Sequence, residues 1–163
     1  FLVAIGGAHI TVLKEHAFED CFDYAFIGEA EKSWEQFLDK YEKGSDLSQV
    51  GGILYRNKEK EIIDTGPAET VGDINELPLP SRHLLKNELY IAGTMNGDKV
   101  FTAMMTTRGC PFNCIFCSTK VFGKSSRRRT PKNVVEEINF SPEGGDGLNV
   151  FKKMWRMVLS YQA

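Results

Sequence analysis

The sequence lacks long hydrophobic runs and an excess of charge of either sign. No apolar stretch approaches the roughly 20 residues that a membrane-spanning helix needs, and no signal peptide is visible. The 163 residues carry a formal net charge of −2 at pH 7, which gives no broad electrostatic attraction to nucleic acid or to an anionic membrane. The sequence therefore predicts no transmembrane segment and no nucleic-acid partner.

Cysteine is scarce, and its placement is uneven. Three of the four cysteines, Cys110, Cys114 and Cys117, fall in one short run with the spacing C-x3-C-x2-C. Such a run can bring three sulfurs to one point without help from distant chain, and gathered thiolates indicate a soft metal or an iron–sulfur cluster. Unpaired cysteines in a close cluster fit a reducing compartment, which predicts a cytoplasmic protein.

Three interpretations of these thiols remain open. An ordinary cubane cluster takes four cysteines, so three leave one iron free to bind a small molecule. A structural zinc site takes four ligands, but the only other cysteine, Cys21, lies 89 positions upstream of Cys110, and no histidine is near the run. Cys21 is interpreted as a small buried hydrophobe. The third interpretation is that the thiols are inert, and the cluster is favoured over both alternatives.

The residues around the cysteines read as one β/α unit of a barrel. Val100–Met105 is apolar and predicts a buried strand, which would place the cysteines on a loop at its carboxyl end, where α/β folds hold their chemistry. Thr130 and Pro131 suit the N-cap and first turn of a helix. The pattern predicts Val134, Val135 and Ile138 on the inner face of this helix, and Glu136 and Glu137 on its outer face.

Residues 1–50 are predicted to be the end of a doubly wound α/β domain. Two strand candidates, Phe1–Ile5 and Tyr24–Ile27, are each followed by glycine. A helix is expected after the second strand, because four large apolar residues there fall on one helical face and Gly44 is placed to end the helix. These four residues are Trp34, Phe37, Leu38 and Tyr41. Strands that alternate with helices favour a parallel sheet.

Residues 51–99 are interpreted as a hairpin and linker. Ile53–Arg56 and Glu61–Asp64 flank the polar turn Asn57–Lys60, which predicts a β-hairpin, and the spaced prolines that follow favour an extended segment. The start of a second domain is expected over 100–138, and a divergent tail over 139–163. That tail is turn-rich at first, and then Leu148–Tyr161 could form an amphipathic helix.

The cysteine run and its surroundings resemble the radical S-adenosylmethionine (SAM) enzymes. C-x3-C-x2-C with Phe116 before the last cysteine matches their signature, and the wider T-T-R-G-C-P-F-N-C-I-F-C-S-T resembles the branch with an N-terminal cobalamin-binding domain. The resemblance implies that Cys110, Cys114 and Cys117 hold a [4Fe–4S] cluster, that SAM chelates its open iron, and that Phe116 lies near the adenine. It also implies an R-x-R pair, matched by Arg127 and Arg129. From the residues alone, the basic run Arg127–Arg129 is either a solvated loop or a segment in which one arginine pairs with a carboxylate or phosphate of substrate or cofactor.

The first fifty residues resemble the C-terminal part of a cobalamin-binding domain. The strings G-G-A-H-I-T and D-Y-A-F-I-G-E-A-E carry this resemblance, whereas the D-x-H-x-x-G and S-x-L segments of such domains are absent. In that fold, paired glycines approach the nucleotide tail of cobalamin, which implies this role for Gly6 and Gly7. The alternative is that both are only turn glycines.

The activity implied by the resemblance is reductive cleavage of SAM to a 5′-deoxyadenosyl radical, in a methyltransferase or cyclase. A small-molecule substrate, cobalamin and an electron donor such as flavodoxin or ferredoxin are implied with it. The alternative is a non-catalytic metal- or iron–sulfur-binding module. From Val100 the chain has 64 residues, whereas a (β/α)8 barrel takes roughly 250. We therefore expect a fragment across a domain junction that is inactive alone.

Overall fold

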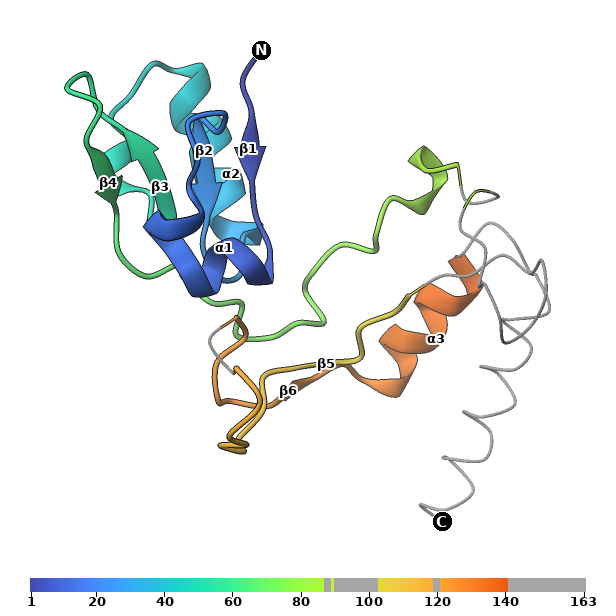
Figure 1. Ribbon diagram of the computed structural model, residues 1–163. Helices are drawn as coiled ribbons and strands as arrows, with labels where there is room; N and C mark the ends of the chain where they lie inside the picture. The colour runs from blue at the N-terminus through green and yellow to red at the C-terminus, as the bar shows by residue number, and fades with distance from the viewer. Residues whose placement is uncertain (87–88, 90–102, 119–120, 141–163) are drawn as a thin grey trace. The chain divides into compact units, whose positions relative to one another are not determined.

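The structure is a computed structural model that describes residues 1–86, 89, 103–118 and 121–140 (Figure 1). The chain divides into two compact units, one formed by Phe1–Ile74 with Thr107–Arg127 and the other by Asn75–Thr106 with Arg128–Ala163. None of the helices in the described ranges is long and apolar enough to cross a membrane. The predicted helix Leu148–Tyr161 lies outside the described residues.

The first unit contains a four-stranded mixed sheet in the order β1-β2-β3-β4, formed by Ala4–Ile5, Tyr24–Phe26, Ile53–Arg56 and Ile62–Asp64. β1 and β2 are parallel, with Ala4 opposite Tyr24. β3 runs antiparallel to β2 and to β4. The α/β class and the parallel first pair are therefore confirmed, and the sheet continues with antiparallel strands.

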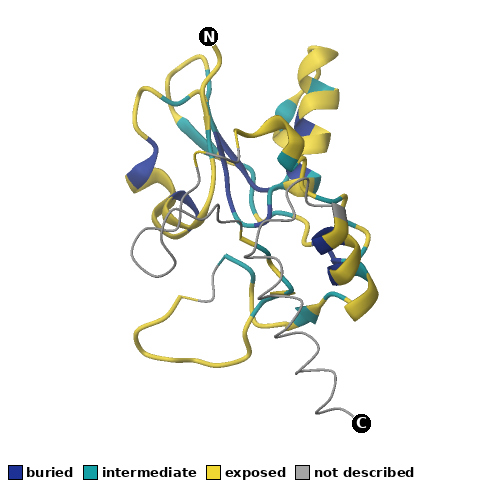
Figure 2. Cartoon of the chain, turned by 90° about the vertical axis from the view of Figure 1, so that its right-hand side faces the viewer, coloured by how far each residue is buried: buried dark blue, intermediate teal, exposed yellow. Residues whose placement is uncertain are grey.

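Helices cover both faces of this sheet. The crossover that a parallel pair requires is supplied by α1 (Ala8–Leu13) and the 3-10 turn η1 (Lys14–Ala17), and Ile10 of α1 packs with Ala25 and Leu54. Successive strand residues point to opposite faces, so Phe26 packs instead with Phe37 of α2 (Glu31–Glu42). Figure 2 shows the buried positions of these central strands in dark blue.

Helix α2 matches the sequence pattern in extent but not in burial. Of the four apolar residues that share one helical face, Phe37 is 1% exposed, whereas Trp34, Leu38 and Tyr41 remain 39–48% exposed. Gly44 ends the helix as predicted. It has a φ of +61°, and the Ser45 amide donates to the Lys40 carbonyl at 2.9 Å, which is the usual glycine-terminated helix end.

The predicted hairpin is confirmed, and it belongs to the sheet of the first unit. Its turn closes when the Glu61 amide donates to Asn57 Oδ1 at 2.8 Å. β3 then pairs along its length with β2, so the hairpin widens the sheet. The hairpin pattern fixes how its two strands pair with each other, but not which sheet they join. A short 3-10 turn, η2 (Leu47–Gln49), leads from α2 towards the hairpin.

In the second unit, α3 (Pro131–Phe140) begins as predicted, because Thr130 Oγ1 accepts from the Asn133 amide at 3.2 Å. Val134 and Ile138 are buried. Two face assignments were wrong: Val135 is 37% exposed and Glu137 is 1% exposed. Glu137 lies three residues after Val134, on the same helical face, and its charge is compensated by two arginines. These are Arg82 at 2.6 Å, from the 3-10 turn η3 (Arg82–Leu84), and Arg129.

Two further expectations need correction. Residues 100–102 lie outside the described part, and Ala103–Met105 form no strand. A strand requires a hydrogen-bonded neighbour, and no described strand pairs with these three residues. The strand that precedes the cysteines is instead β5 (Thr107–Arg108), which pairs with β6 (Arg127–Arg128). Cys21, predicted to be buried, is exposed, because the core at this point is formed by its neighbours Phe18 and Phe22.

Candidate functional site

The three clustered cysteines lie on the segment between β5 and β6, residues 109–126, which we name the cysteine loop. Its amino-terminal limb is held when the Cys110 amide donates to the Gly123 carbonyl at 3.1 Å. A turn at Ile115 and Phe116 follows, closed by the Cys117 amide on the Cys114 carbonyl at 3.1 Å. All three thiols are free and exposed.

Gly109 is required by the way the two limbs of the cysteine loop approach each other. Its φ is +81°, and a Cβ at this position would lie 2.0 Å from the Ser125 carbonyl oxygen. Only glycine allows both the left-handed backbone and this close approach. Gly109 in the R-G-C string therefore has a structural role: it lets Cys110 lie against the limb of the loop that contains Gly123 and Ser125.

The thiols share a loop but are not gathered around one point. Within the described ranges, no group of three or more His, Cys, Asp or Glu side chains is placed to hold a metal ion. Their chemistry nevertheless fits an iron–sulfur cluster, because thiolates are its usual ligands and all three side chains are free of disulfides and accessible. The three thiols are therefore a suitable donor set for an iron–sulfur cluster.

Phe116 lies on the turn between the second and third cysteines, and its side chain is 89% exposed. Two other apolar side chains of the loop, Phe112 and Ile115, are also exposed. Phe116 therefore presents a flat apolar face to solvent on the same loop as the thiols.

Gly6 and Gly7 form the turn at the carboxyl end of β1, and Gly28 follows β2 at the same edge of the sheet. Gly7 has a φ of +99°, and a Cβ there would meet no atom within 4 Å. Thr11 joins the two turns, because its hydroxyl donates to the Gly7 carbonyl at 2.8 Å and accepts from the Gly28 amide at 2.9 Å. This edge is where open α/β sheets bind ligands.

Glu29, which sequence reasoning missed, follows directly after Gly28 and has no exposed side-chain surface. Arg127 donates to it from both terminal nitrogens, with Nη1 to Oε2 at 2.9 Å. Arg108 Nη1 donates to the same Oε2 at 3.3 Å and its Nη2 donates to Glu31 at 2.6 Å. The Val71 amide lies 3.4 Å from Oε2. Glu29 thus connects the sheet edge to both ends of the cysteine loop.

Electrostatics stabilise this cluster as an ion pair. Burial would raise the pKa of Glu29, but the hydrogen bond and charge of Arg127, with smaller contributions from Val71 and Arg108, outweigh it and lower the pKa. Burial would lower the pKa of Arg108, but Glu31 and Glu29 outweigh it and raise that pKa. Both groups are therefore held in their charged forms.

The R-x-R pair has partners within the chain. Arg127 also donates to the Val71 carbonyl at 2.5 Å, and Arg129 pairs with Glu137 and Asn133. No sequence signal could have paired Glu29 with Arg108 and Arg127, which lie 79 and 98 positions away. Arg128, which points to the other side of β6, is exposed.

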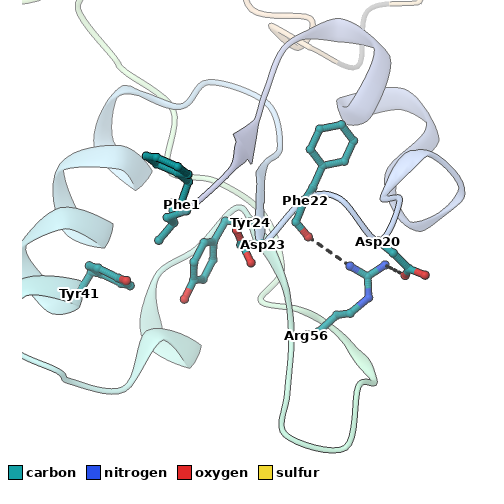
Figure 3. A pocket seen from close by; sticks show the side chains of 8 residues that line it. Phe1, Asp20, Phe22, Asp23, Tyr24, Tyr41 and Arg56 are labelled. Carbon is teal, nitrogen blue, oxygen red and sulfur yellow. Dashed lines mark hydrogen bonds and ion pairs between the residues drawn. The ribbon is translucent and has the colours of Figure 1, made fainter.

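A surface cavity of about 470 Å³ lies at the opposite, amino-terminal edge of the parallel pair (Figure 3). It is lined by Phe1, Leu2, Asp20, Phe22, Asp23, Tyr24, Tyr41 and Arg56. Arg56 spans its rim, donating to the Phe22 carbonyl at 3.2 Å and pairing with Asp20 at 3.2 Å. None of the predicted site residues lines this cavity, so it is separate from the cysteine loop and the glycine turns.

Relatives were found by sequence, although no family profile matches the chain. It is 34% identical over 140 residues to an uncharacterized methyltransferase of Pyrococcus horikoshii, covering 84% of this chain and 29% of that protein. It is 32% identical over 142 residues to an anaerobic magnesium-protoporphyrin IX monomethyl ester cyclase of Cereibacter sphaeroides, covering 84% and 22%. The chain thus spans less than a third of the length of either relative.

Solved structures share the fold. The cobalamin-dependent SAM radical enzyme OxsB, with aqua-cobalamin bound, matches with a TM-score of 0.66 and 23% identity over 85% of this chain and 18% of that one. The radical SAM methyltransferase TsrM from Kitasatospora setae, with cobalamin and a [4Fe–4S] cluster bound, matches with a TM-score of 0.53 and 15% identity over 84% and 28%. By sequence the chain is thus similar to a methyltransferase and a cyclase, and its fold is that of cobalamin-binding radical SAM enzymes, in agreement with the resemblance carried by the cysteine run.

Proposed function

We propose that Cys110, Cys114 and Cys117 hold a [4Fe–4S] cluster whose open iron binds SAM. When bound, this pair supplies reductive cleavage of SAM to a 5′-deoxyadenosyl radical. The observation that carries the proposal is the presence of three free, exposed thiols on one short loop, in a chain whose solved structural neighbour TsrM contains such a cluster.

The other residues of the loop have supporting roles in this proposal. Gly109 lets the first cysteine come close to the returning limb. Phe116 offers a flat face to the adenine of SAM, between two of the ligands. The ordered backbone around Cys110 and around the turn to Cys117 restricts where the sulfurs can lie, which reduces the conformational freedom lost on binding.

We propose further that the glycine edge of the β1–β2 pair takes part in binding cobalamin in the whole protein. Open space around Gly7 and the link through Thr11 to Gly28 leave backbone there accessible to a ligand. The named relatives are methyltransferases and cyclases, so the proposed reaction is methyl transfer or ring closure on a small molecule in the cytoplasm. Flavodoxin or ferredoxin is the proposed electron donor.

Anaerobic reconstitution with iron and sulfide tests the proposal. We expect a brown protein with about four irons per chain, the number in a cubane cluster, and a change in its electron paramagnetic resonance spectrum when SAM is added. A non-catalytic iron–sulfur module would bind iron but show no response to SAM. Preferential retention of zinc, with no iron bound, would contradict the cluster itself.

Phe116→Ala is expected to weaken SAM binding to the reconstituted protein by about one to two factors of ten. Stacking of a base on an aromatic face contributes roughly 1–3 kcal/mol, and about 1.4 kcal/mol corresponds to a factor of ten. Isothermal titration with SAM measures the effect. The iron content should stay unchanged, because Phe116 donates no ligand.

Phe112→Ala is the matched control for Phe116. This side chain is also an exposed aromatic of the cysteine loop, but it lies outside the turn between Cys114 and Cys117. We expect SAM affinity within a factor of three of the unsubstituted protein, given that exposed substitutions usually change free energies by about 0.5 kcal/mol. Equal affinity losses in the two variants, or loss of iron in Phe116→Ala, would count against a stacking role.

A further inference from the structure

The cysteine loop begins and ends at arginines that share one carboxylate. Arg108 directly precedes Gly109, Arg127 lies at the start of β6, and both donate to Oε2 of Glu29. Glu29 belongs to the segment that follows β2, so the anchor for both loop ends comes from the glycine edge of the sheet. The loop also passes close to that edge, since a Cβ on Gly28 would lie 3.9 Å from the Val121 carbonyl oxygen.

The three charged groups of this cluster are shielded from solvent. The Glu29 side chain is fully buried, and those of Arg108 and Arg127 are 15% and 12% exposed. Removing one partner of a buried ion pair leaves an uncompensated charge, which is strongly unfavourable. Arg108 keeps Glu31 as a second, partly exposed partner. Besides Glu29, Arg127 donates to the carbonyl oxygens of Val71 and Phe122.

We infer that Glu29 is a positioning residue that fixes both ends of the cysteine loop against the glycine edge of the β1–β2 pair. Glu29 acts through Arg108 and Arg127, because its hydrogen bonds within the described residues are to these two arginines and to the Val71 amide. Glu29 has this role whether or not the loop carries a cluster. A residue that is not a proposed ligand, and that lies far from the loop in the sequence, thus shapes the loop.

Fixing the ends matters because the three sulfurs must converge on one ligand, and within the described residues they are not placed to hold a metal ion. A loop with anchored ends has fewer conformations to lose when three sulfurs converge on one ligand. Residues that orient ligands without touching the metal typically contribute 10–100-fold to metal affinity. Loss of Glu29 should therefore loosen the loop first and weaken binding of a soft metal in consequence.

Hydrogen–deuterium exchange on Glu29→Gln, without any metal, tests the first step. We expect the Cys110 and Cys117 amides, which are hydrogen-bonded within the loop, to exchange about tenfold faster or more. Amides of the β2–β3 ladder, such as those paired at Ala25 and Leu54, should exchange at unchanged rates. Unchanged loop exchange, or equal acceleration in loop and sheet, would overturn the inference, because the second result describes a purely structural role.

Glu31→Gln is the matched control, since it removes an exposed partner of Arg108 and leaves Glu29 in place. It should change loop exchange by less than a factor of two. If Glu29→Gln does not fold, Arg127→Gln replaces it, with the same expected loop acceleration and the same overturning results.

Titration with Cd²⁺, a soft probe for thiolates, gives the second readout. Glu29→Gln should bind Cd²⁺ about 10–100-fold more weakly than the unsubstituted protein, whereas Glu31→Gln should bind it equally well. Equal Cd²⁺ affinity in Glu29→Gln would overturn the positioning role. Failure of the unsubstituted protein to bind Cd²⁺ or iron would instead defeat the proposed cluster, while the exchange experiment would still decide the role of Glu29.

Discussion

Alanine in place of any one of Cys110, Cys114 and Cys117 should abolish iron retention by the reconstituted protein. A cubane cluster normally has four cysteine ligands. Three thiolates already leave one iron without a protein ligand, so removing one more cysteine would leave two such irons, and we expect the cluster to be lost. The measurement is iron and acid-labile sulfide per chain after removal of unbound ions. We expect about four irons in the unsubstituted protein and close to none in each single variant.

Cys21→Ala is the control for these variants. Cys21 is a free and exposed cysteine like the others, but it lies before β2 and outside the cysteine loop. Its replacement should leave the iron content unchanged. If Cys21→Ala lost metal as completely as the loop variants, the result would indicate a zinc-like site with four cysteine ligands and not a three-cysteine cluster.

Features controlled by neighbouring residues were predictable from the sequence. The carboxyl end of α2 depends on Gly44, whose backbone accepts the left-handed conformation. The start of α3 depends on Thr130, whose side-chain oxygen caps the helix. The hairpin turn at Asn57–Lys60 is equally local. That the three cysteines share one loop was predictable for the same reason, because they lie within a few residues of one another in the sequence.

Features that depend on distant pairing were not predictable in this way. Glu137 was placed on the outer face of α3 because it is charged, but Arg82 and Arg129 neutralise it and allow its burial. Glu29 follows the same rule in the first unit, with Arg127 as its principal partner. A carboxylate gives no sign in the sequence of whether an arginine from far along the chain will meet it.

These two glutamates give a physical role to the R-x-R pair. Arg127 pairs with Glu29 within the first unit, and Arg129 pairs with Glu137 within the second. Each arginine of the pair therefore ties the chain that leaves the cysteine loop to a buried glutamate of its own unit.

Gly109→Ala should open the cysteine loop, with the largest conformational effect of any single methyl addition there. A Cβ at Gly109 would lie 2.0 Å from the Ser125 carbonyl oxygen and 2.8 Å from its carbon. Both atoms are backbone, so no side chain can move aside to make room. The limbs must separate, and the hydrogen bond from Cys110 to Gly123 should break with them. Hydrogen exchange at Cys110 and the iron content after reconstitution both report this change.

Gly123→Ala separates the steric effect of Gly109→Ala from backbone strain. Gly123 also has a left-handed backbone, with φ of +69°, but a Cβ there would meet nothing within 4 Å. It should therefore lose only the roughly 1–2 kcal/mol that a left-handed conformation costs an ordinary residue, and still retain iron. Gly109→Ala has the same strain plus the clash, so we expect it to lose the loop hydrogen bond and most of the iron. Similar exchange rates and iron contents in the two variants would mean that the limbs do not approach as closely as the structure shows.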